Sequence, residues 1–156
     1  MHEVKTSYFD RYRKIKLAQS ADSNIYYRYL TRHISALITA ALVNTSITPN
    51  IVTTTMFVFG IIGGICFSFG ESLLYALGGI FFILLNVADT VDGELARYKG
   101  LSSPFGDYLD RLAHYVTNSS MILGLGVGLY INHGNLLILY AMIAVLLFYL
   151  FDDLSR

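Results

Sequence analysis

The sequence contains few charged residues for its length. Only 14% of its 156 residues are charged, whereas 54% are hydrophobic. A soluble domain carries about 25% charged residues, so this composition favours a protein that lies in lipid. The formal net charge is zero, which gives no support for a nucleic-acid partner.

Cysteine is almost absent as well. Cys66 is the only one and lies inside an apolar run, which excludes a disulfide framework and a Cys-x-x-Cys metal site. No long apolar run begins before residue 30, so the N-terminal segment does not have the form of a secretory signal. Residues 1–28 mix basic and aromatic side chains, and we expect an arm or helix on an anionic membrane surface. A plain cytoplasmic tail is the alternative.

Apolar stretches occupy most of the remaining chain. In residues 30–47 only the part from Ile34 to Val43 is free of strongly polar groups. These ten or so residues rise about 15 Å as a helix, half the hydrocarbon core, so we expect an interfacial helix. Four longer stretches each approach the roughly 20 residues that a membrane span needs. These stretches are 51–69, 72–88, 112–131 and 135–151.

The predicted fold is therefore an all-α integral membrane bundle. A cytoplasmic arm and interfacial helix occupy residues 1–47, and a domain of four transmembrane helices occupies residues 48–156. With four spans, the arm, the connection 97–111 and Arg156 lie on one side of the membrane. That side holds all eleven Lys and Arg residues, which predicts that the N-terminus and residues 89–111 are cytoplasmic.

Acidic residues gather on both sides of the predicted connection between the second and third spans. On two antiparallel helices, residues spaced by three or four share a face, and the two faces can meet. Ionisable groups at the membrane edge usually face a protein interior and mark a working site. The residues that share these faces are Asp89, Asp92, Gly93 and Ala96 on the first helix and Gly106, Asp110 and His114 on the second.

Three carboxylates at close range cannot all stay ionised without cations between them. Hard oxygen ligands suit Mg²⁺ or Mn²⁺. Two such ions about 4 Å apart would clamp a diphosphate during a displacement. Gly93 and Ala96 leave room for a ligand near the backbone, and Arg97 offers a fork of donors for a phosphate.

The pattern D-x2-D-G-x2-A-R-x8-G-x3-D, from Asp89 to Asp110, resembles the motif of the CDP-alcohol phosphotransferases, also called the CDP-alcohol phosphatidyltransferase family. The stretch TPNIVT at residues 48–53 is similar to the family's TPNxxT. Together the similar features cover roughly residues 30–131. The resemblance implies transfer of a substituted phosphate group from a CDP-alcohol, such as CDP-diacylglycerol, to an alcohol acceptor. It also implies release of CMP, dependence on Mg²⁺ or Mn²⁺, a role in phospholipid biosynthesis and a homodimer.

The resemblance also implies roles for single residues. The metal ligands would be Asp89, Asp92 and Asp110. The pocket for the CDP-alcohol would be shaped by Gly93, Ala96, Arg97 and Gly106, with Asn50 and Thr53 nearby on the first span.

Two features depart from the family pattern. His114 stands where the family has a fourth aspartate, which would bind metal and act as the base for the acceptor hydroxyl. An imidazole can act as a base, and it can bind Mn²⁺ or Zn²⁺, but it is a poor ligand for Mg²⁺. The family core also has six spans, whereas this sequence predicts four.

Two other functions compete with the transferase. A protein that keeps the donor site without catalysis would bind a CDP-ligand and metal but release no CMP. A divalent-cation transporter would also place acids in the membrane, although here they all lie at one edge. Among the other residues, we expect Asp107 to be a solvated acid at a helix start and Glu94 to face water or the arm. Gly60, Gly63 and Gly64 should permit close helix packing.

Overall fold

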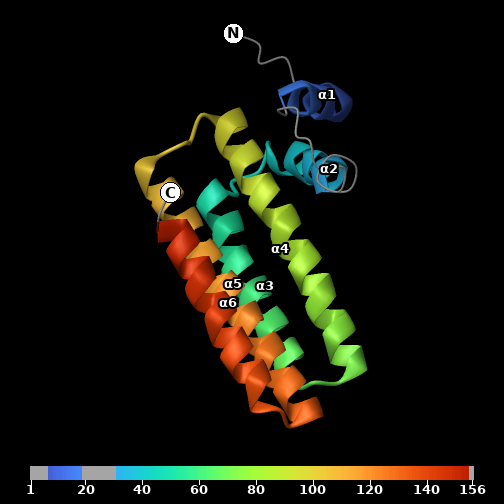
Figure 1. Cartoon of the computed structure of the whole chain (residues 1–156). Helices are drawn as coiled ribbons and strands as arrows, with labels where there is room; N and C mark the ends of the chain where they lie inside the picture. Colours follow the sequence, from blue (N-terminus) through green and yellow to red (C-terminus); the bar gives the residue numbers. More distant parts are fainter. Residues whose placement is uncertain (1–6, 19–30, 155–156) are drawn as a thin grey trace.

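The computed structural model describes residues 7–18 and 31–154, which form six helices and no strand (Figure 1). The remaining residues of the N-terminal arm, 1–6 and 19–30, lie outside the described part. The helices are α1 (Tyr8–Ala18), α2 (Arg32–Leu42), α3 (Pro49–Ser68), α4 (Ser72–Lys99), α5 (Pro104–His133) and α6 (Leu136–Leu154). The all-helical prediction is confirmed.

Glycine and proline set the ends of the long helices. Gly100 ends α4 and Gly134 ends α5, both with a positive φ that glycine adopts without a steric penalty. Pro104 opens α5, and the Ser103 hydroxyl caps this helix by accepting a hydrogen bond from the amide of Gly106. α4 continues unbroken from its apolar part through the acidic motif, from Ser72 to Lys99.

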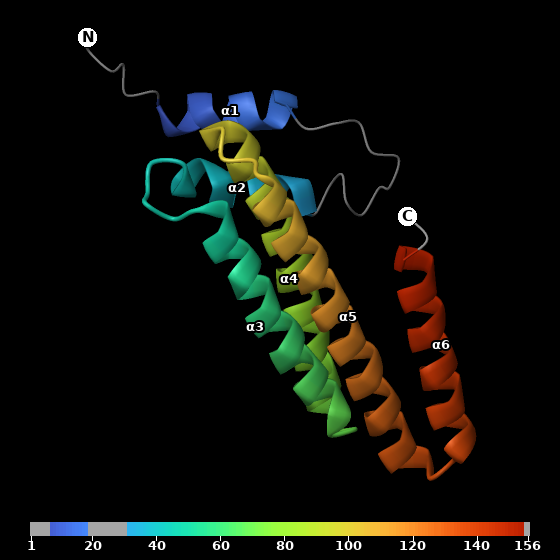
Figure 2. The same cartoon turned by 90° about the vertical axis from the view of Figure 1, so that its left-hand side faces the viewer.

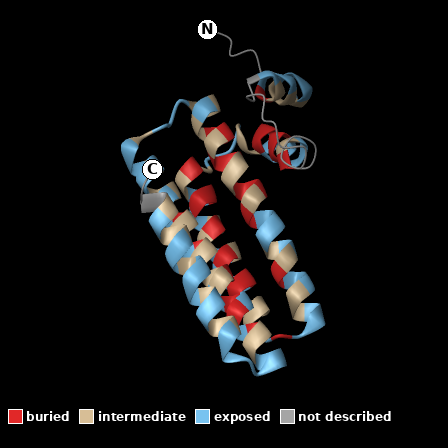
Figure 3. Cartoon of the chain, viewed as in Figure 1, coloured by how far each residue is buried: buried red, intermediate tan, exposed pale blue. Residues whose placement is uncertain are grey.

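The centre of the bundle is α3, which packs against both α4 and α5. Buried residues run along α3, whereas α6 packs on α5 and is largely exposed (Figure 3). Glycines allow the closest approach of α3 to α5. A Cβ on Gly124 would collide with the backbone of Gly64, and one on Gly60 would collide with Thr117. The prediction that the glycines of α3 permit close packing is confirmed.

The helices α1 and α2 lie across one end of the bundle, with α1 beside α2 (Figure 2). Ile15 of α1 is buried with Ala36 and Ala40 of α2. The ammonium group of Lys14 lies 5.4 Å from the ring centre of Tyr98, near the end of α4, a distance at which a cation is attracted to the ring. Helix α1 therefore contacts both α2 and the C-terminal end of α4, the helix that carries Asp89 and Asp92.

α2 is held to α4 by a buried polar contact. The carboxylate of Glu94 is 4% exposed and accepts hydrogen bonds from the hydroxyls of Ser35, at 2.9 Å, and Thr39, at 2.8 Å. Glu94 was expected to face water or the arm; it does not face water, and its carboxylate contacts α2, which follows the arm. Burial of this carboxylate is tolerated because both of its oxygens are hydrogen-bonded.

Much of the surface of the long helices is apolar. Within the described residues, α3 and α4 are long and apolar enough to cross a membrane, and the apolar part of α6 is shorter. Ile34, Leu37 and Ile38 are also exposed on α2, on the side away from its buried polar contact. Exposed apolar surface on this scale is a feature of membrane or interaction surfaces.

Candidate metal and substrate site

Two acids and a histidine come together where the C-terminal part of α4 meets the N-terminal part of α5. The Nε2 atom of His114 lies 3.0 Å from Asp89 Oδ1 and 3.5 Å from Asp110 Oδ1. One ligand atom from each of the three residues lies within 4.8 Å of the other two. Asp89 reaches this point from α4, whereas Asp110 and His114 project from successive turns of α5. We call these three residues the acidic cluster.

Asp92 belongs to the same face of α4 but is turned elsewhere. Its carboxylate is 7% exposed and accepts a 2.7 Å hydrogen bond from the hydroxyl of Thr53 on α3. Three of the four predicted metal ligands therefore lie together, and Asp92 lies beside them on the wall of a pocket. Its contact with Thr53 places the TPNxxT segment directly against the acidic motif.

The acidic cluster carries features that a cation would satisfy. The Oδ1 atom of Asp110 is buried and accepts no hydrogen bond from the described residues. Two carboxylates and an imidazole fit a divalent cation that accepts oxygen and nitrogen ligands, such as Mn²⁺, and Mg²⁺ would rely on the carboxylates.

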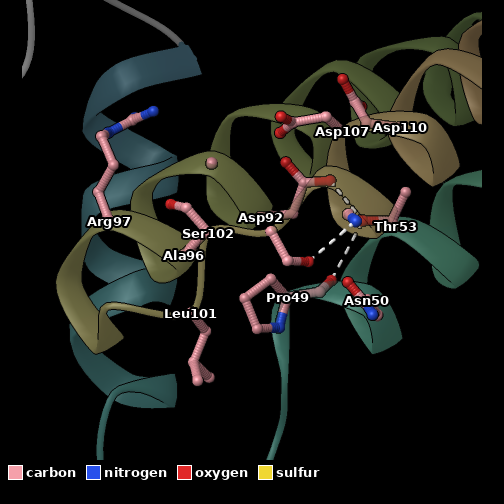
Figure 4. Close-up of a pocket in the computed structure, with 13 residues that line it drawn as sticks. Pro49, Asn50, Thr53, Asp92, Ala96, Arg97, Leu101, Ser102, Asp107 and Asp110 are labelled. Carbon is pink, nitrogen blue, oxygen red and sulfur yellow. Dashed lines mark hydrogen bonds between the residues drawn. The ribbon is translucent and has the colours of Figure 1, made fainter.

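A pocket of about 140 Å³ opens between the ends of α3, α4 and α5 (Figure 4). It contains every residue that the sequence predicted for the substrate site. These residues are Asn50, Thr53, Gly93, Ala96, Arg97 and Gly106. Asp92 and Asp110 also line the pocket, so Asp110 is shared between the pocket and the acidic cluster. In Figure 4 the carboxylates lie on one side of the pocket and Leu101 on the other.

The two glycines of the pocket lie where other side chains approach the backbone. A Cβ on Gly93 would lie 3.2 Å from the guanidinium of Arg97, one turn further along α4. A Cβ on Gly106 would lie 3.5 Å from the side-chain oxygen of Asn50. The absence of a side chain at Gly93 therefore keeps space for Arg97, whereas a Cβ at Gly106 would make only an ordinary contact with Asn50.

The sequence did not predict two residues that lie beside the site, Asp107 and Tyr149. Asp107 is exposed and in the first turn of α5, as expected, but it also lines the pocket. Its position three residues before Asp110 on a helix could have indicated this. Tyr149 of α6 contacts the carbonyl of His114. No spacing rule connects residues on α5 and α6, so this contact had no signal in the sequence.

Comparison with known proteins gives one family match and one related protein. Residues 46–152 match the CDP-alcohol phosphatidyltransferase family. The protein named bifunctional IPC transferase and DIPP synthase, from Thermococcus kodakarensis, is 36% identical over 97 residues. The match covers 62% of this chain and only 21% of that relative. Because the family match includes the motif, the pocket and the acidic cluster, the chain belongs to the CDP-alcohol phosphatidyltransferase family.

Proposed function

We propose that this protein transfers a substituted phosphate group from a CDP-alcohol to an alcohol acceptor and releases CMP. The donor would be a nucleotide such as CDP-diacylglycerol, and the reaction would belong to phospholipid biosynthesis. Membership of the family supports a phosphotransferase of this type. The name of the T. kodakarensis relative also describes a transferase and a synthase.

One observation carries the proposal. The pocket that contains the predicted substrate residues adjoins the acidic cluster through Asp110, which lines the one and belongs to the other. A nucleotide in the pocket would therefore hold its diphosphate beside Asp89, Asp110 and His114. A divalent cation held there by the carboxylates of Asp89 and Asp110 would neutralise charge on the diphosphate oxygens, and the imidazole of His114 would then be available to accept a proton.

The residues of the chain have distinct tasks in this reaction. Arg97 would bind phosphate oxygens of the donor, since its guanidinium provides several donors in one plane. The acceptor oxygen forms a bond to the β-phosphorus of the donor, and the bond from that phosphorus to the CMP oxygen breaks with its electron pair. The hydroxyl proton passes to the imidazole of His114. Asp89, 3.0 Å from Nε2, would orient the ring and stabilise its charged form.

The same proposal places the protein in a membrane. We take α3, α4, α5 and α6 as four spans, α2 as an interfacial helix, and the acidic cluster and N-terminus as cytoplasmic. In Figures 1 and 2, α1, α2 and the connection between α4 and α5 lie at the same end of the bundle. Every described Lys and Arg belongs to these elements or to the adjoining helix ends, which supports that orientation.

A product assay on the purified protein in lipid nanodiscs tests this function. The protein is offered a panel of CDP-alcohols and alcohols with Mg²⁺ or Mn²⁺, and both products are identified by mass spectrometry. We expect CMP and a transferred phosphate ester in equal amounts. Metal-dependent binding of a CDP-alcohol without any CMP would instead show a donor-binding protein that lacks catalysis.

A further inference from the structure

The side of α5 that carries His114 continues along the helix towards α6. Asn118, Ile122 and Leu129 follow His114 at intervals of four or seven residues, so they share one helix face. α6 packs on α5 and on no other described helix to a comparable extent. This face of α5 is polar near the acidic cluster and apolar beyond Asn118.

Tyr149 joins the two helices at the boundary between the polar and apolar parts. Its hydroxyl accepts a 2.9 Å hydrogen bond from the side-chain amide of Asn118 and lies 3.3 Å from the carbonyl oxygen of His114, to which it donates. Val145, Met142 and Ile138 precede Tyr149 on the same face of α6. Both helices therefore change from polar to apolar at the same level.

An apolar cavity of about 340 Å³, open to the surface of the bundle, lies between α5 and α6 on the apolar side of this boundary. Met142 packs against Gly126, where a Cβ would collide with it. No charged or hydrogen-bonding side chain lines the cavity. The lining residues are Ile122, Leu125, Gly126, Leu129, Ile138, Ala141, Met142 and Val145.

We propose that this cavity holds the apolar chain of a lipid alcohol, and that this lipid is the acceptor of the reaction. The inference rests on the proposed function, because it places the lipid hydroxyl at His114. Ile122 is two helical turns from His114, about 12 Å along the helix. A chain in the cavity would therefore leave room for a polar head group that passes Asn118 and Tyr149 to reach the acidic cluster.

The positions of the nucleotide pocket and of the α5–α6 cavity agree with the geometry of phosphoryl transfer. The attacking and leaving oxygens lie roughly in line on opposite sides of the phosphorus. The nucleotide pocket and the α5–α6 cavity share no lining residue, and the acidic cluster adjoins the pocket through Asp110. CMP would leave on the pocket side, and an acceptor held between α5 and α6 would attack from the side of His114.

Two alanines on α6 provide a matched test. Both alanines are exposed, but Ala141 lines the cavity and Ala144 lines no part of it. Ala141→Phe fills the cavity, and Ala144→Phe adds the same side chain to another face of the same helix. CMP release is measured in nanodiscs with alcohols that share one head group and differ in chain length. We expect Ala141→Phe to raise the KM for long-chain alcohols by about tenfold or more.

The affinity for the CDP-alcohol should be the same in the wild type and both variants, and Ala144→Phe should leave the KM unchanged. Equal KM values in all three proteins, or CMP release that needs only a water-soluble acceptor, would overturn this inference and leave the transferase intact. An oligomeric state altered by Ala141→Phe alone, with an unchanged KM, would overturn it in favour of a helix from a second copy. Absence of CMP release from the wild type with every acceptor would contradict the proposed function itself.

Discussion

The hydroxyl of Thr53 donates a 2.7 Å hydrogen bond to the buried carboxylate of Asp92. Thr53 belongs to the first turns of α3, and Asp92 lies on α4, so the bond joins the two helices at the wall of the nucleotide pocket. Asp92 is not one of the three residues of the acidic cluster, which are Asp89, Asp110 and His114.

Thr53→Val removes this donor and keeps the shape of the side chain. Because a buried carboxylate would lose its hydrogen-bond partner, the free energy of unfolding should fall by about 1–3 kcal/mol. Binding of a CDP-alcohol should weaken as well. Thr54→Val is the control, since the Thr54 hydroxyl is exposed and bonds within its own helix. Thermal unfolding in detergent and ligand titration measure the two effects, and equal results for both variants would contradict the assigned contact.

The hydrogen bonds of Glu94 on α4 to α2 predict that substitutions at Glu94 and at Thr39 have non-additive effects on the free energy of unfolding. Thr39→Val should destabilise the protein by about 1–3 kcal/mol, because it removes the hydroxyl that donates a hydrogen bond to the buried Glu94 carboxylate. The same substitution made together with Glu94→Leu should cost much less. A double-mutant cycle on unfolding free energies measures the difference. Additive effects would mean that Thr39 and Glu94 do not interact.

Asp110→Asn should remove the metal dependence of nucleotide binding. The amide keeps the size of the side chain but is a weaker ligand than the carboxylate, whose Oδ1 is buried without a hydrogen bond from the described residues. Titration of a CDP-alcohol with and without Mn²⁺ measures this. Asp107→Asn serves as the comparison, because Asp107 lines the pocket but is not part of the acidic cluster. Unchanged metal-dependent binding in Asp110→Asn would rule out Asp110 as a ligand.

Two glycines in different surroundings test the packing of α3 on α5. Gly124→Ala places a methyl group against the backbone of Gly64, so the helices must separate and the melting temperature should fall. Gly79→Ala meets nothing within 4 Å and should be neutral or slightly stabilising, because alanine favours a helix. A fall of the same size in both variants would argue against this close approach.

Much of the fold follows from patterns within single helices. The apolar runs predicted the positions of α3 and α6 and the start of α4 to within a few residues, and the spacing of Asp110 and His114 placed both on one face of α5. These features depend on local sequence, which is why one sequence was sufficient to predict them.

Contacts between distant segments were harder to predict. Nothing in the spacing of the motif indicated that Asp92 would turn to Thr53 while Asp89 turned to His114, because the helix face is the same for both acids. Glu94 was expected to face water or the arm, and nothing in the sequence indicated that two hydroxyls on α2 would make its burial possible. The nearness of Asn50 to the motif was expected only from the family resemblance.

The rate of CMP release from the wild type and from His114→Ala, measured in the same nanodiscs at saturating CDP-alcohol and acceptor, tests the central claim most directly. Loss of a general base typically lowers the rate by about 10²–10⁴-fold, and the affinity for the CDP-alcohol should change far less. This result would assign the proton transfer to His114. Equal rates would contradict that role, and absence of CMP from the wild type would contradict the transferase altogether.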